Sequence, residues 1–518
     1  MGNDARVSEP LEAASSFKYE KAGIEHKKHV IDEASKKRGI DEEQIAKFRQ
    51  FVEAGPEWHR VMKRKLLRKV DLHLLPLLVL MYLLNFLDRN NLSQARLGTL
   101  EKDLQMKGTD FNLATSILFV GYILMQLPSN LILTRMRPSL YLGTAMAIWG
   151  VISTAQAACT SFGGLVAARF FLGFAEAPFF PGAIFLMSSW YTRGEMAYRI
   201  AWFYSGSSLA NAFGGLIGAG VLSNLSGAHG ISGWRWLFII EGSITIGVSL
   251  LATVILPNYP ATTRWLTAEE QAYAQWRLLD DTGEEDEAAA SSIMEGVKLA
   301  FRDPKLYLFT LLQHTSLLSQ TFQYFFPSIV NTLGFGKVET LLLTAPVWVA
   351  TFLVSLVVTY TSGRFADRSI HIMCLMMISV VGNITVVSTL NTATRFFAMF
   401  LLPIGAVTSY QIVLAWVANS FPHPLVKRSA CISFANLVGN SANIYGSYMY
   451  PASDGPRYLP GGTATASVAL LVVVLALVAR LVLKAENIKL AEREQFENSR
   501  SNSGGDPDRV GVGFRYVL

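Results

Sequence analysis

Residues 163–188 read GGLVAARFFLGFAEAPFFPGAIFLMS and hold two charged residues, Arg169 and Glu176, among apolar and small ones. A helix of about 20 apolar residues crosses the roughly 30 Å hydrocarbon core of a bilayer. This stretch therefore predicts a membrane-spanning helix. A charge at the bilayer centre costs about 2.5 to 3.5 kcal/mol on insertion scales, so both charged residues mark a functional site. They are two helical turns apart and project from the same face.

Eleven further stretches of similar length and hydrophobicity lie on either side of this one. We predict them at 72–94, 112–134, 139–159, 199–222, 234–256, 305–331, 339–361, 370–390, 395–418, 428–449 and 464–484. The fold class that follows is all-α, a polytopic membrane protein of twelve transmembrane helices in two six-helix bundles.

The composition supports a membrane protein and excludes other classes. The chain is 51% hydrophobic and 16% charged, whereas soluble domains are about a quarter charged. Its net charge of +6 is not arranged as a basic face, so no nucleic acid partner is expected. The three cysteines stand at no metal-ligand spacing, and nucleophile and phosphate-binding motifs are missing. We expect no cofactor, no metal and no enzyme activity; the expected partners are a lipid bilayer, a small anion and protons.

The spacing of the spans divides the chain into five parts. We predict an N-terminal tail at 1–71, a six-helix bundle at 72–256, a polar, acidic linker at 257–304, a second bundle at 305–484 and a tail at 485–518. No removable signal peptide is evident in the first 70 residues. Basic residues flank alternate loops and favour the cytoplasmic side, so both termini and the linker are expected there, most simply at the plasma membrane. The basic residues are Lys63, Arg64, Lys65, Arg68, Lys69, Arg135, Arg137, Arg193, Arg199, Arg364, Arg368, Lys427 and Arg428.

The charged residues that we consider inside the spans all lie in the first half. Asp88 and Arg89 lie in span 1 and either form a functional pair or snorkel from the helix end. Arg169 and Glu176 either serve the solute or form an ion pair with a neighbouring helix. Glu241 and Arg235, the latter between two tryptophans, are better explained as structural or gating residues at the interface.

The second half offers polar but uncharged side chains. Gln323 and Tyr324 lie in span 7, and Trp416 lies in span 10. Asn436, Asn440 and Asn443 follow at helical spacing and share one stripe of span 11. Interhelical hydrogen bonding explains such a stripe as well as solute contact does. We predict that Asn436 and Asn440, with Gln323, Tyr324 and Trp416, contact the solute.

Several motifs resemble one known family. They are LDRxN at 87–91, RxxLGxxEA at 169–177, WRWLFIIEG at 234–242, WLTxEE at 265–270, FP and LG at 326–327 and 333–334, and PRY at 456–458. Through these motifs the chain resembles the major facilitator superfamily and, within it, the anion:cation symporter branch and the fungal allantoate-permease-like group. The superfamily's loop signature stands at Gly363, Asp367 and Arg368, where it implies gating. After span 2, residues 134–138 read TRMRP and depart from that signature, which puts the gate contact there in doubt.

The resemblance implies roles for the charged residues. Arg89 and Arg169 would contact the anion, with Asn85 beside them, and Asp88 and Glu176 would couple protons. The resemblance implies proton-driven symport that imports a small anion, with sulfate or a related sulfur-containing anion as first choice. Its alternatives are an organic carboxylate such as nicotinate, pantothenate, biotin or allantoate, and a nutrient sensor on the same scaffold.

Overall fold

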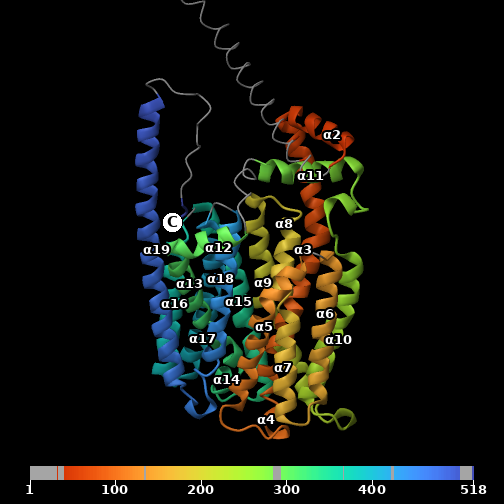
Figure 1. The fold of residues 1–518 in the computed structure, drawn as a ribbon. Helices are drawn as coiled ribbons and strands as arrows, with labels where there is room; N and C mark the ends of the chain where they lie inside the picture. The colour runs from red at the N-terminus through yellow and green to blue at the C-terminus, as the bar shows by residue number, and fades with distance from the viewer. Residues whose placement is uncertain are drawn as a thin grey trace, which may run out of the picture. The chain divides into compact units, whose positions relative to one another are not determined.

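The computed structural model describes residues 40–133, 136–283, 293–365, 367–421, 425–501 and 516–518, together with residues 28, 32 and 35. Over these residues the chain is all-α, as the ribbon in Figure 1 shows. Three sequence predictions fall partly outside them: the N-terminal tail at 1–71, the acidic stretch of the linker at 284–287, and the tail at 485–518. Residues 134 and 135 of the loop after span 2 also lie outside.

Most of the α-helices coincide with the predicted spans. The α-helices are α2 (Glu42–Glu53), α3 (Pro56–Ala95), α4 (Leu100–Asp103), α5 (Asp110–Leu133), α6 (Pro138–Ala155), α7 (Phe162–Glu176), α8 (Phe179–Ser188), α9 (Arg193–Asn224), α10 (Gly233–Ile255), α11 (Ala268–Gly283), α12 (Ile293–Arg302), α13 (Pro304–Leu318), α14 (Phe326–Asn331), α15 (Lys337–Phe365), α16 (Ser369–Ser388), α17 (Thr392–Asn419), α18 (Leu425–Gly446) and α19 (Leu459–Ser501). Of these, α2, α4, α11 and α12 lie outside the predicted spans. Each of the twelve predicted spans falls on one helix or on consecutive short ones, the fourth on α7 and α8 and the seventh on α13 and α14.

Seven helical stretches among the described residues are long and apolar enough to cross a membrane by length and composition: Pro56–Ala95, Phe162–Ser188, Gly233–Ile255, Lys337–Phe365, Ser369–Ser388, Thr392–Asn419 and Leu459–Glu492. The other predicted spans fall on α5, α6, α9, α13–α14 and α18. Several of these carry more serine, asparagine and glutamine, which lowers their hydropathy.

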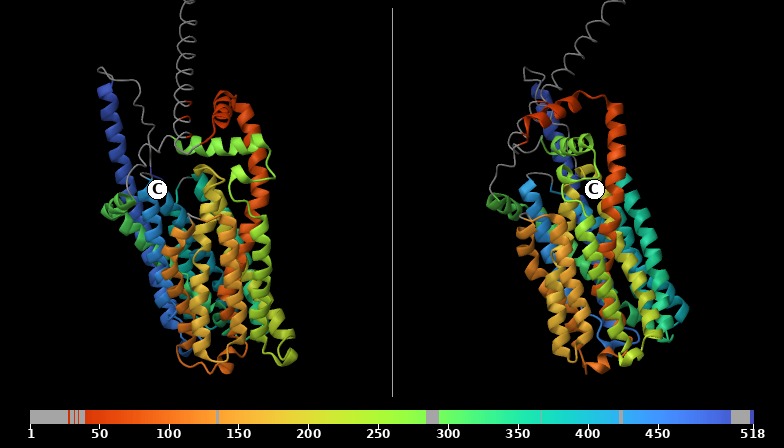
Figure 2. Two further views of the ribbon diagram at one scale, coloured as in Figure 1. Left: turned by 45° about the vertical axis from the view of Figure 1, so that its right-hand side comes forward. Right: turned by 90° about the vertical axis from the view of Figure 1, so that its right-hand side faces the viewer.

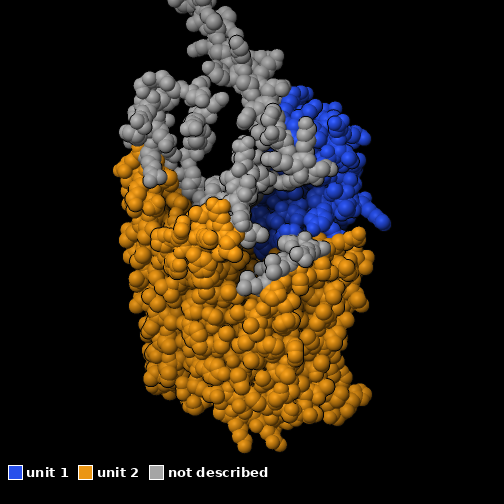
Figure 3. Space-filling view, in the orientation of Figure 1, with its two compact units in different colours: residues 1–76, 184–196, 255–291 blue, residues 77–183, 197–254, 292–518 orange. Residues whose placement is uncertain are grey.

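The chain divides into two compact units, which Figure 3 colours separately. Unit 1 comprises residues 1–76, 184–196 and 255–291, and unit 2 comprises residues 77–183, 197–254 and 292–518. The domain boundaries drawn from the sequence remain a prediction.

In unit 1, helix α11 is held by charges and by aromatic packing. Thr267 and Glu270 form a reciprocal cap at its start, with the Glu270 amide donating to Thr267 Oγ1 at 3.3 Å and the Thr267 amide donating to Glu270 Oε2 at 3.0 Å. Lys69 Nζ lies 2.8 Å from the same carboxylate, and Lys65 Nζ lies 3.1 Å away. These hydrogen bonds outweigh burial and lower the pKa of Glu270 to about 2. The aromatic rings of Phe51, Trp58, Tyr273 and Trp276 pack together around α11.

The region predicted as a polar linker therefore contains two helices, α11 and α12. Helix α12 lies against α18, where the rings of Phe301 and Phe434 meet edge to face with centroids 4.9 Å apart. Lys427 reaches Asp303 at 2.7 Å, just before α13. The acidic composition of the linker did not predict the packing of α12 on α18, because that packing depends on a few apolar residues at helical spacing.

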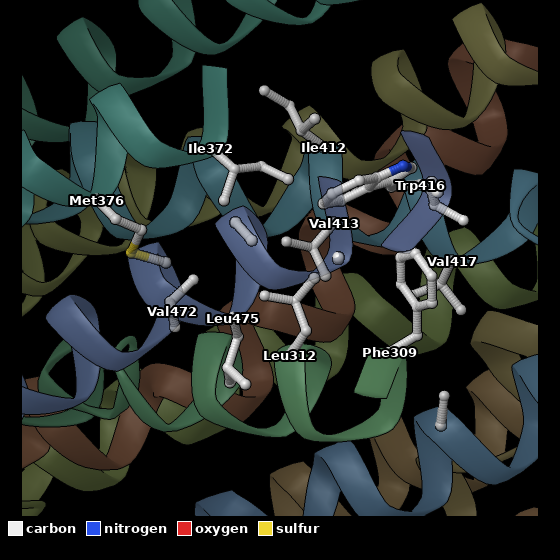
Figure 4. Close-up of a cluster of buried hydrophobic side chains, with 14 of the residues drawn as sticks. Phe309, Leu312, Ile372, Met376, Ile412, Val413, Trp416, Val417, Val472 and Leu475 are labelled. Atoms are coloured by element: carbon white, nitrogen blue, oxygen red, sulfur yellow. The ribbon is translucent and has the colours of Figure 1, made fainter. Parts of the chain in front are cut away.

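The long helices of unit 2 run alongside one another in both views of Figure 2. One part of its core, shown in Figure 4, gathers apolar side chains from α13, α16, α17 and α19. Residues 516–518 pack against the same cluster through Tyr516 and Leu518. Trp416 at its edge is fully buried, and its Nε1 donates to the carbonyl of Val517 at 2.8 Å.

Helices α6 and α10 approach closely and run antiparallel. Gly143 of α6 packs against Thr253 of α10, Gly150 packs against Ile246, and Gly242 of α10 packs against Thr154. A Cβ at Gly150 would lie 2.9 Å from Ile246 Cγ1, so any larger residue would force the helices apart at a cost of about 1 to 3 kcal/mol. These pairs fix the register of α6 on α10.

Span 7 is broken near its middle. Helix α13 ends at Leu318, a 3₁₀ segment η5 occupies Thr321–Phe325, and α14 starts at Phe326 with Pro327 in its first turn. Proline has no amide hydrogen to donate and fits best in a first turn, so the helix restarts here. The break sets the direction of Gln323 and Tyr324.

Candidate functional site

Unit 2 contains a cavity lined by both halves of the chain. α3, α5, α8 and α9 contribute from the first half, and α13, η5, α17 and α18 contribute from the second. Seven of the lining side chains are aromatic: Tyr82, Phe86, Tyr122, Phe180, Tyr204, Tyr324 and Tyr410. The polar lining residues are Arg89, Gln126, Ser207, Gln320, Gln323, Asn436, Asn440 and Asn443, and the aliphatic ones are Leu317 and Val407.

Arg89 of α3 is the positive charge of this cavity. Its Nη2 and Nε donate to Glu176 Oε2 at 2.7 and 3.0 Å. The guanidinium carbon lies 5.3 Å from the ring centroids of Phe86 and Tyr122 and 5.6 Å from that of Phe119. Both members of the ion pair are buried, with Glu176 at 1% exposure. Arg89 therefore does not snorkel, and Glu176 makes its ion pair with Arg89 rather than with Arg169.

Arg169 of α7 lies outside the cavity lining. It is 1% exposed, its Nη2 donates to the carbonyl of Arg89 at 3.1 Å, and its Nε donates to the carbonyl of Ala114 at 3.3 Å. It also interacts electrostatically with Glu176. Asn85 is buried next to the same carboxyl group. As placed, Arg169 supports the backbone that carries Arg89 and adds positive charge behind the cavity.

Asp88 points away from the cavity. Its two oxygens accept hydrogen bonds from Ser153 Oγ of α6 at 2.6 Å and from Thr245 Oγ1 of α10 at 2.7 Å. Glu241, one turn from Thr245, is buried and interacts electrostatically with Asp88. Arg235 donates to the carbonyl of Ala157 and lies over the Trp234 ring, with its guanidinium carbon 4.4 Å from the centroid. A structural role for Arg235 agrees with these contacts.

Four of the five residues of the second half that were predicted to contact the solute line the cavity. Gln323, Tyr324, Asn436 and Asn440 all line the cavity, and Tyr324 interacts with Arg89 across it. Asn436 also accepts a hydrogen bond from Gln313 Nε2, so the asparagine stripe serves both helix packing and the cavity. Trp416 lies elsewhere, because its ring packs against Phe309 in the hydrophobic cluster.

Of the residues of the predicted loop signature, Gly363 lies near the end of α15, and Asp367 and Arg368 lie just before α16. Asp367 accepts two contacts from Arg480 Nη1 of α19 at 2.7 and 2.9 Å, and one hydrogen bond from the Ile370 amide. These contacts lower the pKa of Asp367 despite its partial burial. Arg368 is mostly buried, and its amide donates to the carbonyl of Leu518. Gly363 is exposed, with open space where a Cβ would lie.

Apart from Tyr324, the aromatic lining was not predicted from the sequence. Tyr82, Phe86 and Arg89 are spaced by four and three residues, so they form one stripe of a helix. That stripe could have been recognised, because Arg89 was already singled out. Tyr122, Phe180 and Tyr204 carry no such local signal; aromatic residues are common in membrane helices, and only the tertiary arrangement brings these together.

The chain matches the family model described as Major Facilitator Superfamily over residues 78–447. The protein belongs to the major facilitator superfamily. Among its relatives, the "MFS-type transporter cnsO" of Penicillium expansum is 32% identical over 495 residues, covering 92% of this chain and 95% of that protein. The "Major facilitator-type transporter hxnP" of Emericella nidulans is 34% identical over 414 residues, covering 78% and 82%.

Solved structures of the superfamily share the fold at low identity. A bacterial homologue of the human lysosomal transporter Spinster, inward-facing and unoccupied, covers 78% of this chain and 94% of its own, with a TM-score of 0.57 and 16% identity. A D-xylose-proton symporter covers 77% and 97%, with a TM-score of 0.56 and 15% identity. The all-α polytopic fold is thus confirmed. As a member of this superfamily, the protein is a multi-pass membrane transporter of a small solute. The superfamily consists of transporters and not of enzymes.

Proposed function

We propose that the protein is a proton-coupled symporter that imports a small organic carboxylate. The observation that carries this proposal is the setting of Arg89, the one cation among the described lining residues, which is paired with Glu176 and surrounded by aromatic rings. Guanidinium can bind carboxylate in a planar, two-pronged geometry, and two nitrogens of Arg89 already donate to one carboxylate oxygen of its own chain, Glu176 Oε2.

The aromatic faces of the lining support the proposal of an organic anion. Sulfate carries two charges and no apolar surface, so it needs several donors to replace its hydration shell. Seven aromatic residues give this cavity apolar faces, which suit a flat, unsaturated carboxylate such as benzoate or nicotinate. Sulfate, the first choice from the resemblance, stays a prediction and is one arm of the test below.

Proton coupling follows from competition for Arg89. While Glu176 is ionised it holds the guanidinium and repels an incoming anion. Protonation of Glu176 weakens that ion pair and releases Arg89 for the anion. The loaded cavity then holds one arginine, one anion and one neutral acid, which is cheaper to enclose in a low-dielectric intermediate than an unbalanced charge. A proton gradient directed inward would drive import, with both termini cytoplasmic and the plasma membrane as the site.

A matched panel of anions tests the proposal. The purified carrier is reconstituted into vesicles, and uptake of labelled benzoate is measured with and without an inward proton gradient. Cyclohexanecarboxylate has the same charge and similar size but no aromatic face, and sulfate has neither ring nor single charge. We expect benzoate to be accumulated, cyclohexanecarboxylate to compete less well, and sulfate to compete weakly.

Two outcomes would overturn the proposal. Stronger competition by sulfate than by either carboxylate would return the assignment to a sulfate carrier. Binding of benzoate without uptake by a well-folded carrier would favour a sensor on the same scaffold.

A further inference from the structure

A second polar cluster lies between α3, α6 and α10, away from the cavity. Its first layer is Asp88 with Ser153 and Thr245, whose hydroxyl groups satisfy the carboxylate. None of these three residues lines the cavity. The layer therefore joins the three helices but does not touch the proposed solute.

A second layer lies one helical turn further on. Asn91 follows Asp88 by three residues, Gln156 follows Ser153 by three, and Glu241 precedes Thr245 by four, so each shares the face of its partner in the first layer. The contacts Gly150 to Ile246, Gly242 to Thr154 and Arg235 to Ala157 show that α10 runs antiparallel to α6 in this register. Thr245 contacts Asp88, and Trp234 contacts Gly98 just after α3, so α10 also runs antiparallel to α3 and the shift on all three helices is in the same direction.

This second layer is buried and unsatisfied. Asn91 and Gln156 are 0% exposed and Glu241 is 1% exposed. Among the described residues, neither polar side-chain atom of Asn91, Gln156 or Glu241 has a hydrogen-bond partner. A buried polar atom without a partner costs about 1 to 3 kcal/mol and a buried charge costs more, so six such atoms in one layer indicate something that fills it.

The charges around the layer define the chemistry of that ligand. Asp88 of α3 is the charged group that interacts with Glu241, and Asp88 in turn interacts with Glu176 and Arg169 of α7. Helix α6 contributes the uncharged Ser153, the 3₁₀ segment η1 (Gln156–Ala158) that follows it contributes Gln156, and Arg235 of α10 is directed to the Ala157 carbonyl. The buried cluster thus combines the carboxyl groups of Asp88 and Glu241 with amide and hydroxyl oxygens. Such a donor set suits a small cation.

We propose that Asn91, Gln156 and Glu241, with Asp88, form a second site that binds one small monovalent cation, a proton or Na⁺, separately from the solute cavity. A proton would reside on Glu241 and be shared with the amide oxygens; Na⁺ would take oxygens from all three side chains. Binding of the cation itself does not depend on the proposed function. Its use as a coupling ion does rest on that function.

The test uses the full-length carrier in detergent, without solute. Its apparent unfolding temperature is measured over a range of Na⁺ at fixed pH, balanced with choline, and over a range of pH without Na⁺. Infrared difference spectra between low and high pH are recorded for the band of a protonated carboxyl group. The variants are Glu241→Gln, Gln156→Ala in case the first misfolds, and the control Ser249→Ala, which removes a buried hydroxyl group two turns away on the same stripe of α10.

A Na⁺-dependent rise in unfolding temperature, lost in Glu241→Gln and kept in Ser249→Ala, assigns Na⁺. A protonated-carboxyl band and a pH-dependent shift that Glu241→Gln removes assign the proton. In either case Gln156→Ala should weaken the dependence at least tenfold in cation concentration. The proposal is overturned if Glu241→Gln keeps the dependence of the parent on both Na⁺ and pH. Since solute is absent, this failure is distinct from a failure of anion uptake.

Discussion

The substitution Glu176→Gln tests the competition for Arg89 most directly. The carboxylate oxygen lies 2.7 Å from Arg89 Nη2, which places the two charge centres about 4 Å apart. At an effective dielectric constant of about 20, unit charges at that distance attract by about 4 kcal/mol. A glutamine oxygen still accepts a hydrogen bond from Arg89, which retains about 1 kcal/mol. An anion that must displace ionised Glu176 therefore meets about 3 kcal/mol more resistance than one that meets glutamine, or about a hundredfold in affinity.

The assay is equilibrium binding of labelled benzoate to the purified carrier from acid to alkaline pH. In the parent, affinity should fall as pH rises and Glu176 ionises; in Glu176→Gln it should stay near its acid value throughout. The variant should still exchange bound anion across vesicles yet lose proton-driven accumulation. Glu339→Gln, which makes the same change at an exposed position of α15, is the control. A Glu176→Gln carrier whose affinity falls with pH as steeply as the parent's would refute the competition, and undiminished accumulation would remove Glu176 from the coupling.

Four further predictions concern the two arginines, Tyr324, Glu270 and the topology. Arg89→Ala should fold and lose anion binding, whereas Arg169→Ala should weaken binding by displacing the Arg89 backbone; binding and size-exclusion profiles check both, and unchanged affinity in either variant marks that arginine as structural. Tyr324→Leu should cost benzoate about tenfold in affinity relative to cyclohexanecarboxylate if its ring stacks on the solute, and equal losses would contradict stacking. Because the pKa of Glu270 is lowered to about 2, its carboxylate adds on the order of 1 to 3 kcal/mol to the free energy of unfolding above about pH 4.5, and this stabilisation is lost as pH falls towards 2. Acid unfolding curves of Glu270→Gln should lack this pH-dependent loss. Tags at either terminus and in the 280–290 linker should be reached from the cytoplasmic side alone, and labelling of any of them from outside would overturn the proposed topology.

The spans could be predicted from the sequence because the bilayer imposes a length and a composition on each helix separately. Arg89 and Glu176 were recognisable for the same reason, since a charge within an apolar run stands out without tertiary information. Their pairing was not, because it joins residues 87 positions apart on different helices. The Arg169–Glu176 spacing suggested a shared face, yet Arg169 turns to backbone carbonyl groups instead.

Uncharged residues were harder to assign. Trp416 and Asn436 have similar sequence settings, each a polar side chain in an apolar span, but one lies against Phe309 and the other lines the cavity. Which face of a helix meets the cavity depends on how the helices are rotated, and the sequence of one helix does not determine that rotation. Helix α11 was not predicted because the acidic composition of the region suggested only solvent exposure. The Thr267–Glu270 cap at its start is a local sequence signal that this composition outweighed.

The break in span 7 has a consequence for the range of compounds the carrier accepts. A 3₁₀ turn has weaker hydrogen bonds than an α-helix, so residues 321–325 rearrange at less cost than the helices around them. Gln323 and Tyr324 sit on this turn, whereas Arg89 is fixed on the continuous helix α3. For the proposed anion, Arg89 on the continuous helix would supply the recognition of charge, and Gln323 and Tyr324 would supply the adaptable part of the lining. We expect strict selection for one negative charge combined with tolerance of different ring sizes and substituents.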